Sequence, residues 1–403
     1  MDKDSRRNNC IEDRLRGKRV LIWGHGLEGK SAEAFLQARG NVSALDVYEG
    51  DQSGIDEAAY DYIIKSPGIR ENHWNGKYTS VTELFLQEFG SQTVGITGTK
   101  GKSTTASLLY QVLKAAQKRP VVLVGNIGIP CLDAYEEIGD DTIIVFELSC
   151  HQLDHLRVSP HLAVFLNLYE EHLDRYDTME RYFEAKKGIT IHQGANDIFY
   201  IGPQVPAIET AAETRVIDAP AEGAYALKLS GAHNQYNAHV VYTIATEQFG
   251  CDPAAAREAL AAFTGLPHRM QYLGRENGID YYDDSISTIP EAAIAALESV
   301  ENAKTVLIGG MDRGIRYDIL ENYMREHPEF EYICMYDSGK RIYDAVAPLA
   351  HCHYREDLAG AVALAKERTP QGGACILSPA AASYGYFRNF EERGDVFASL
   401  VLQ

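Results

Sequence analysis

Short apolar runs alternate with amphipathic stretches along most of the chain. Apolar runs that predict strands occur at KRVLIW, TVGITG, VVLVG, TIIVF and LAVFLNL, and later at GIDYYDD, TVLIGG, EYICMY and ACILS. Helical patterns separate these runs, for example in PEAAIAALESV. Strands that alternate with helices are typical of α/β folds with mostly parallel sheets.

The order of these elements predicts three α/β domains. We place them at residues 1–92, 93–267 and 268–403, and a chain of 403 residues is long enough for two or three domains. Residues 203–224 are rich in Pro, Ala, Glu and Thr, which predicts a surface segment within the second domain.

The composition limits the partners and the compartment. A formal charge of -19 disfavours nonspecific binding to nucleic acid or to anionic membranes. The seven cysteines have no metal-ligand spacing and do not suggest a disulfide framework, so a reducing cytoplasm is expected. No window approaches the ~20 apolar residues of a membrane span, and the N-terminus has no apolar core typical of an export signal.

Residues 94–114, VGITGTKGKSTTASLLYQVLK, predict a strand, a glycine loop and a helix in succession. Such a loop binds triphosphates: Gly98 and Gly101 open backbone amides to phosphate oxygens, Lys102 adds a cation, and Ser103 offers a hydroxyl to Mg²⁺. The match is to a variant, because Ile96 stands where the usual pattern has glycine. The alternative is a turn that caps an ordinary helix.

A second glycine loop lies near the N-terminus. Gly24, Gly26 and Gly29 spell GxGxxG, and Asp46 is expected at the end of the next strand, as in dinucleotide-binding folds. The loop would hold a diphosphate, which occurs both in NAD and in nucleoside-diphosphate sugars. The alternative is a turn that packs the helix on the strand. The turn KSPGI, residues 65–69, is expected to line the same crevice.

Two further strand ends carry candidate metal ligands. Glu147 ends the run TIIVF, and carboxylate oxygens suit Mg²⁺. His172 lies in NLYEEHLDRY, which follows another apolar strand. A solvated acid at 147 and a packing histidine at 172 are the alternatives.

Lys186 falls within an apolar helical stripe. Met179, Tyr182, Lys186 and Ile189 share one face of the predicted helix. Burial would lower the pKa of the amine, and a neutral amine can react with CO₂ to give a carbamate able to act near Mg²⁺. The alternative is a lysine that extends from the edge of the stripe to water.

These motifs occur together in one order. GTKGKST, GNIG, ELSCHQL, NLYEEHLDRY, EAKKGI, GAHNQYNA, GLPHRMQ, YYDDS and LSPAAASYGYFRNFEERG resemble the Mur ligases of peptidoglycan synthesis over nearly the whole chain. The resemblance implies a Rossmann-like N-terminal domain, a central P-loop ATPase-like domain with a mostly parallel sheet, and a C-terminal Rossmann-like domain.

The resemblance also implies roles for individual residues. ATP would be bound by Gly98, Thr99, Lys100, Gly101, Lys102, Ser103, Thr104, Asn234, Asn237, Arg269 and Asp284. Two Mg²⁺ ions would be held by Ser103, Glu147, His172 and the carbamate of Lys186, and Lys102, His172 and Lys186 would be catalytic. The acceptor and amino-acid substrates would be bound by Gly26, Leu27, Asp46, Ser66, Gly68, Asn126, Thr288, Arg313, Ser383 and Phe390.

The activity implied is ATP-dependent addition of D-glutamate to UDP-N-acetylmuramoyl-L-alanine through an acyl phosphate, by a cytoplasmic monomer. L-glutamate is an alternative, because Ile286 in DSIST stands where the family pattern commonly has lysine. A ligase similar to folylpolyglutamate synthase is a second alternative. Outside the family, the alternatives are an NAD-dependent oxidoreductase and a nucleotide switch without catalytic activity.

Overall fold

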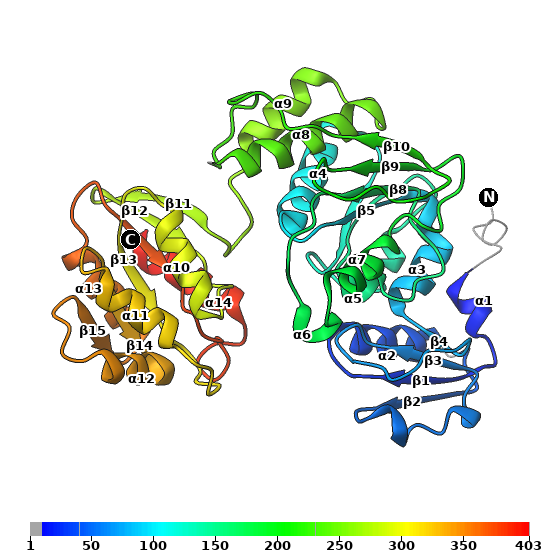
Figure 1. Cartoon of the computed structure of the whole chain (residues 1–403), viewed down its shortest axis with the longest axis horizontal. Coiled ribbons are helices and arrows are strands. Elements are labelled where there is room, and N and C mark those ends of the chain that lie inside the picture. The colour runs from blue at the N-terminus through cyan, green and yellow to red at the C-terminus, as the bar shows by residue number, and fades with distance from the viewer. Residues whose placement is uncertain (1–9, 40, 230, 403) are drawn as a thin grey trace. The chain divides into compact units, whose positions relative to one another are not determined.

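The chain divides after Phe263 into two compact units, shown in the computed structural model of Figure 1. The structure describes residues 10–39, 41–229 and 231–402. The first unit contains two sheets and the second contains one.

The N-terminal sheet is parallel, with strand order β2-β1-β3-β4. Its strands are β1 (Arg19–Trp23), β2 (Ala44–Tyr48), β3 (Tyr62–Lys65) and β4 (Tyr78–Thr79). The helices of this segment are α1 (Ile11–Leu15), α2 (Leu27–Arg39) and α3 (Val81–Phe89). β1 is an inner strand of this sheet and is mostly buried. The glycine loop that follows it therefore begins at the carboxyl end of an inner strand.

The second sheet is also parallel, with strand order β10-β9-β8-β5-β7-β6. Its strands are β5 (Thr93–Thr97), β6 (Val121–Gly125), β7 (Ile143–Glu147), β8 (Leu162–Phe165), β9 (Ile198–Ile201) and β10 (Glu213–Val216). Its helices are α4 (Lys102–Ala116), α5 (Cys150–Leu153), α6 (Leu173–Tyr176), α7 (Met179–Lys187), α8 (Ala232–Glu247) and α9 (Pro253–Ala262).

The register of the second sheet aligns its central strand ends. Ile96 of β5 pairs with Glu147 of β7, and Thr97 pairs with Phe165 of β8. All five residues of β5 are buried. The segments after β5, β7 and β8 therefore leave the sheet at one edge, where parallel α/β sheets bind ligands.

Residues 203–224 are mostly exposed, which confirms the predicted surface segment, but they contain a strand that was not predicted. They include β10, which pairs with β9 at the edge of the sheet. Three of its four residues are exposed, so the strand lacks the apolar alternation by which strands are recognised in a sequence.

The C-terminal unit has one sheet with strand order β11-β12-β16-β13-β14-β15. Its strands are β11 (Gln271–Glu276), β12 (Ile279–Asp283), β13 (Ala303–Ile308), β14 (Glu331–Met335), β15 (Cys352–Arg355) and β16 (Ala374–Leu377). Its helices are α10 (Pro290–Ser299), α11 (Asp318–Glu326), α12 (Tyr336–Val346), α13 (Leu358–Arg368) and α14 (Phe390–Val401). Only the β11–β12 pair is antiparallel among the described strands.

The predicted α/β fold with mostly parallel sheets is confirmed. Each of the three predicted domains contains one sheet, and the division at 1–92, 93–267 and 268–403 stays a prediction. Within the described residues, every helix is too short or too polar to cross a bilayer.

Candidate active site

The phosphate loop connects β5 to α4 at the centre of the second sheet. Gly101, just before α4, has a left-handed backbone with φ 83°. A Cβ at this position would lie 2.8 Å from Oδ1 of Asn237, which is buried on α8. Only glycine suits this conformation and this close approach. The predicted strand, loop and helix are confirmed, and Asn237 lies beside the loop as the motifs suggested.

Two lysines donate to the same carbonyl oxygen in this loop. Lys102 Nζ lies 3.0 Å from the Gly98 oxygen and 2.9 Å from that of Thr99. Lys186 Nζ lies 2.9 Å from the Gly98 oxygen. Two ammonium groups on one acceptor repel each other, so the site concentrates positive charge at the start of α4.

Lys186 is buried in the apolar stripe predicted for its helix. Its side chain is 1% exposed, and its Nζ lies 4.9 Å from the centre of the Tyr182 ring. The alternative of a lysine that extends to water is therefore wrong. Burial, with the neighbouring Lys102 charge, lowers the pKa of Lys186 to about 7. A substantial fraction of the amine is thus neutral near pH 7 and can react with CO₂.

Oxygen donors lie beside the lysines. Ser103, in the first turn of α4, donates its hydroxyl to Glu147 Oε1 at 3.1 Å. Glu147 ends β7 and is 1% exposed, so the alternative of a solvated acid is wrong. A hydroxyl and a carboxylate next to a glycine loop are the ligands that Mg²⁺ takes in phosphate sites, and this pair fits that ion.

A central cavity of about 330 Å³ brings the predicted residues together. It is lined by Glu28, Pro67, Gly68, Lys102, Asn126, Ser149, Cys150, His151, Gln152, His172, Tyr182 and Lys186. Five of these were predicted as site residues: Gly68, Lys102, Asn126, His172 and Lys186. Burial lowers the pKa of another lining residue, His151, to about 4, so its imidazole is neutral.

A second cavity of about 500 Å³ lies over the N-terminal glycine loop. It is lined by Gly24, His25, Gly26, Leu27, Glu28, Glu49, Gly50, Ser66, Pro67, Gly68 and Ile69. Four predicted residues are among them: Gly26, Leu27, Ser66 and Gly68. A Cβ on Gly29 would lie 2.1 Å from the Gly24 oxygen, so this glycine also lets the helix pack closely on the strand.

Asp46 does not end its strand, and this expectation was wrong. β2 continues to Tyr48, and Asp46 lies at its middle, where it accepts a hydrogen bond from the Tyr60 hydroxyl at 3.1 Å. Asp46 is exposed and is not among the residues that line the glycine-loop cavity. The acid that follows β2 and lines the cavity is Glu49.

Glu28 lines both cavities. Its Oε1 accepts a hydrogen bond from Gln152 Nε2 at 2.6 Å, and its Oε2 is shielded from solvent and has no hydrogen-bond partner among the residues that the structure describes. Gln152 is held in turn by a capping box at the start of α5, in which its Oε1 accepts from the Ser149 amide at 2.9 Å. Burial raises the pKa of Glu28 to about 7.

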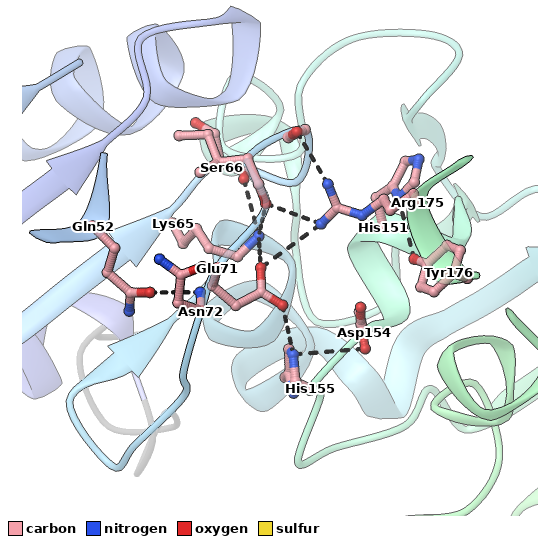
Figure 2. Close-up of polar contacts among 12 residues, drawn as sticks. Gln52, Lys65, Ser66, Glu71, Asn72, His151, Asp154, His155, Arg175 and Tyr176 are labelled. Carbon is pink, nitrogen blue, oxygen red and sulfur yellow. Dashed lines mark hydrogen bonds and ion pairs between the residues drawn. The ribbon is translucent and has the colours of Figure 1, made fainter. Parts of the chain in front are cut away.

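The loop formed by residues 66–69 is held by two cations (Figure 2). Lys65 Nζ donates to the Ile69 oxygen at 2.7 Å, and Arg175 donates to the oxygens of Gly68 and Ile69 at 3.1 and 2.9 Å. Glu71 lies between the cations, 3.0 Å from Lys65 and 3.7 Å from Arg175. Burial would raise the pKa of the Glu71 carboxyl, but the hydrogen bond from His155 and the charge and hydrogen bond of Lys65 lower this pKa to about 2.

The C-terminal unit contains six of the predicted residues, namely Arg269, Asp284, Thr288, Arg313, Ser383 and Phe390. Asp284 accepts from the Ser378 hydroxyl at 2.8 Å, and burial raises the pKa of Asp284 to about 6. Arg393 is fully buried and donates to the Ser285 oxygen at 2.7 Å and to the Ala381 oxygen at 3.1 Å. It therefore joins the segment of Asp284 and Thr288 to that of Ser383.

The other predicted residues of this unit differ in exposure. Ser383 is buried, Thr288 and Phe390 are half-buried, and Arg269 and Arg313 are exposed. Phe390 begins α14, and its ring lies 6.1 Å from that of His268.

Known proteins resemble this chain over nearly its full length. Residues 96–219 match the family described as the Mur ligase middle domain. A Salinispora tropica protein named UDP-N-acetylmuramoyl-L-alanine--L-glutamate ligase is 34% identical over 446 residues, which cover 96% of this chain and 98% of the relative. The chain belongs to the Mur ligase family.

Other comparisons agree with that family. A Symbiobacterium thermophilum protein named UDP-N-acetylmuramoylalanine--D-glutamate ligase is 34% identical, over 95% of this chain and 98% of the relative. The crystal structure of Thermotoga maritima MurF with ADP has a TM-score of 0.56 and 18% identity, over 97% of this chain and 96% of that one. The latter likeness concerns the fold alone.

In this Mur ligase, Glu28, Gln152, Arg175 and Arg393 lie within the motifs quoted above, but these motifs predicted no role for them. Glu28 stands inside the GxGxxG signature, where a carboxylate is unexpected beside a diphosphate, and this was the one available signal. The other three act through contacts with segments far away in the sequence.

We expect Glu28→Gln to remove a pH-dependent contribution to stability. Folding keeps Glu28 protonated up to about pH 7, whereas a glutamate carboxyl in water has a pKa of 4.5. The stability that this group supplies is complete below pH 4.5 and is lost as the pH rises through 7. Relative to wild type, the free energy of unfolding of E28Q should therefore increase on the order of 1–2 kcal/mol between about pH 5.5 and pH 8. Urea unfolding measures it, and a difference independent of pH would contradict the raised pKa.

We expect Arg175→Lys to loosen the loop of residues 66–69, because one ammonium cannot reproduce the forked guanidinium contacts with two carbonyls. Amide exchange in peptides that cover the loop should be about 10-fold faster, since bonds to charged groups contribute roughly 1.5–3 kcal/mol. The control is Arg181→Lys, at an exposed arginine of α7 that pairs with Asp177. Equal exchange in both variants would show that Arg175 does not hold the loop.

Proposed function

We propose that this Mur ligase couples ATP to the addition of glutamate onto UDP-N-acetylmuramoyl-L-alanine. The observation that carries the proposal is that the two cavities are adjacent: Glu28, Pro67 and Gly68 line both. A nucleoside-diphosphate sugar at the N-terminal glycine loop can thus extend its acyl end to Lys102 and Lys186. The names of the relatives support the same pair of substrates.

The diphosphate of the acceptor substrate would lie against the N-terminus of α2, where backbone amides and the helix dipole favour anions. Its alanine carboxylate attacks the γ-phosphate of ATP, which gives an acyl phosphate and ADP. The amine of glutamate then attacks the acyl carbon, and phosphate leaves.

Lys102 serves this chemistry by charge and position. Its ammonium lies at the loop expected to hold the β- and γ-phosphates, where it would stabilise the negative charge of phosphoryl transfer. Asn237 lies close against the loop at Gly101. Bound Mg²⁺ would further neutralise the phosphate oxygens, with Ser103, Glu147 and His172 as its protein ligands.

Carbamylation of Lys186 is part of the proposal. Reaction of the neutral amine with CO₂ forms a C–N bond and releases one proton, which replaces a cation by an anion. The repulsion between Lys186 and Lys102 would become an attraction. The buried, half-neutral amine supports this step.

The roles of Asn234, Arg269 and Asp284 toward ATP, and of Thr288, Arg313, Ser383 and Phe390 toward glutamate, stay predictions. The cytoplasmic location and the monomeric state stay predictions too. Membership of the family removes the oxidoreductase alternative.

Some relatives are named for D-glutamate and others for L-glutamate. The resemblance predicts D-glutamate, and a relative at 34% identity carries that name. L-glutamate is the second candidate, favoured by Ile286 in place of a lysine and by a relative of equal identity named for L-glutamate.

The test supplies UDP-N-acetylmuramoyl-L-alanine, ATP and Mg²⁺ with either enantiomer. We expect one amide product, identified by mass, and about stoichiometric phosphate release. When either the acceptor or glutamate is omitted, phosphate release should be slow, because the acyl phosphate needs both partners to turn over. Rapid ATP hydrolysis by the enzyme alone, or no amide with either enantiomer, would refute the proposal.

We expect Lys186→Ala to abolish ligation but to leave the affinity for UDP-N-acetylmuramoyl-L-alanine within about threefold, since Lys186 does not line the glycine-loop cavity. The loss of activity should exceed about 100-fold, as expected for a group that stabilises transferring charge. Lys187→Ala is the matched control, because the neighbouring side chain pairs with Glu184. Retained activity in K186A would remove the carbamate from the mechanism.

A further inference from the structure

Three soft or borderline metal ligands meet in the wall of the central cavity. The ligand atoms of Cys150, His151 and His172 all lie within 4.8 Å of one another, and all three residues line the cavity. We propose that they form a site for Zn²⁺, and that Zn²⁺ bound there inhibits ligation. The binding step is independent of the proposed function, whereas the inhibition rests on it.

Two separate segments bring the ligands together. Cys150 and His151 begin α5, directly after the Ser149 cap that follows β7. His172 precedes α6 with a left-handed backbone, φ 58°, which turns the segment after β8. The rings of His151 and His172 have their centres 5.1 Å apart and meet edge to face, at 65°. The juxtaposition thus depends on the strand ends of the sheet, not on a spacing motif.

The distances suit a tetrahedral ion after small side-chain movements. Zinc bonds of about 2.0–2.3 Å to nitrogen and sulfur separate neighbouring ligand atoms by about 3.3–3.8 Å. Atoms within 4.8 Å of each other need to approach by roughly 1.5 Å at most, which side-chain rotation supplies. A fourth position would face the cavity, as in zinc sites with three protein ligands and one exchangeable ligand.

The surroundings already orient one of the imidazoles. The Tyr176 hydroxyl lies 3.1 Å from His151 Nδ1, and the two rings are stacked, with centres 5.7 Å apart and a tilt of 10° (Figure 2). Partners of this kind fix the orientation of metal-ligating histidines. The nearby ammonium group of Lys102 opposes a dication, so we expect moderate affinity.

Ligand chemistry separates this site from the magnesium site. Mg²⁺ takes oxygen ligands, such as those of Ser103 and Glu147, whereas a thiolate with two imidazoles selects Zn²⁺. His172 belongs to both sets, so zinc would draw it from the magnesium site. Release of the thiol proton accompanies zinc binding, because the thiolate is the ligand.

Cobalt is the spectroscopic probe for the test. Titration of the metal-free full chain with Co²⁺ should produce one equivalent of a thiolate-to-cobalt charge-transfer band, which added Zn²⁺ should abolish. The band should be absent in Cys150→Ser. In Tyr176→Phe the affinity for Co²⁺ should fall about 10-fold, as for the loss of other outer-shell partners. Circular dichroism checks that each variant folds.

The matched control is Cys251→Ser. Cys251 is a buried thiol that accepts a hydrogen bond from Gln117 at 3.3 Å and does not line the central cavity. This variant should keep both the charge-transfer band and its basal activity. Cobalt binding without a thiolate band, or a band that survives in C150S, would overturn the site.

The inhibition is measured as ligation at fixed Mg²⁺ with increasing Zn²⁺, each variant relative to its own zinc-free rate. We expect the inhibiting concentration to rise at least about 10-fold in C150S and to stay unchanged in C251S. Equal sensitivity of C150S and wild type would overturn the inhibitory role. If no amide forms under any condition, the proposed function fails while the cobalt spectrum still decides the zinc site.

Discussion

The shared carbonyl oxygen of Gly98 is the contact on which the rest of the site depends. Lys102 and Lys186 both donate to it, from α4 and α7. The chain as a whole carries a formal charge of -19, yet its proposed substrates are anions. Long-range attraction therefore cannot collect them, and a small volume of concentrated positive charge has to do so locally. The sheet register supplies that volume, because it aligns the ends of β5, β7 and β8.

The sequence was sufficient to predict those site residues whose position follows from the hydrophobic pattern of their neighbours in the chain. The phosphate loop has a strand and a helix immediately around it, and the helical stripe that includes Tyr182 and Lys186 pointed to a buried amine as one of two alternatives. Glu147 was placed correctly because an apolar run ends at that residue. Such predictions depend only on residues that are neighbours in the chain. The resemblance of the motifs to Mur ligases then predicted the family, but Ile286 left the enantiomer of glutamate open.

Contacts between remote segments were beyond the sequence. Asp46 was expected at a strand end, but two more residues of β2 pair with β1. The exposed strand β10 has no apolar signature. Arg175 carries no sign that it reaches the carbonyls of Gly68 and Ile69, about a hundred positions earlier. The cluster of Cys150, His151 and His172 likewise exists only because β7 and β8 flank β5.

The capping box at Ser149 includes a side chain, Gln152, that makes both a local and a long-range hydrogen bond. Gln152 uses its amide oxygen to begin α5 and its amide nitrogen to contact Glu28 in the N-terminal glycine loop. A substitution at Ser149 would leave the side-chain amide of Gln152 free to rotate. Glu28 would then lose its hydrogen-bond donor, although neither Glu28 nor Gln152 had changed. Glu28, Ser149 and Gln152 therefore depend on one another. If a homologue lacks Glu28, the hydrogen bond from Gln152 is no longer needed and Ser149 can change as well, so we expect the three positions to vary together among homologues.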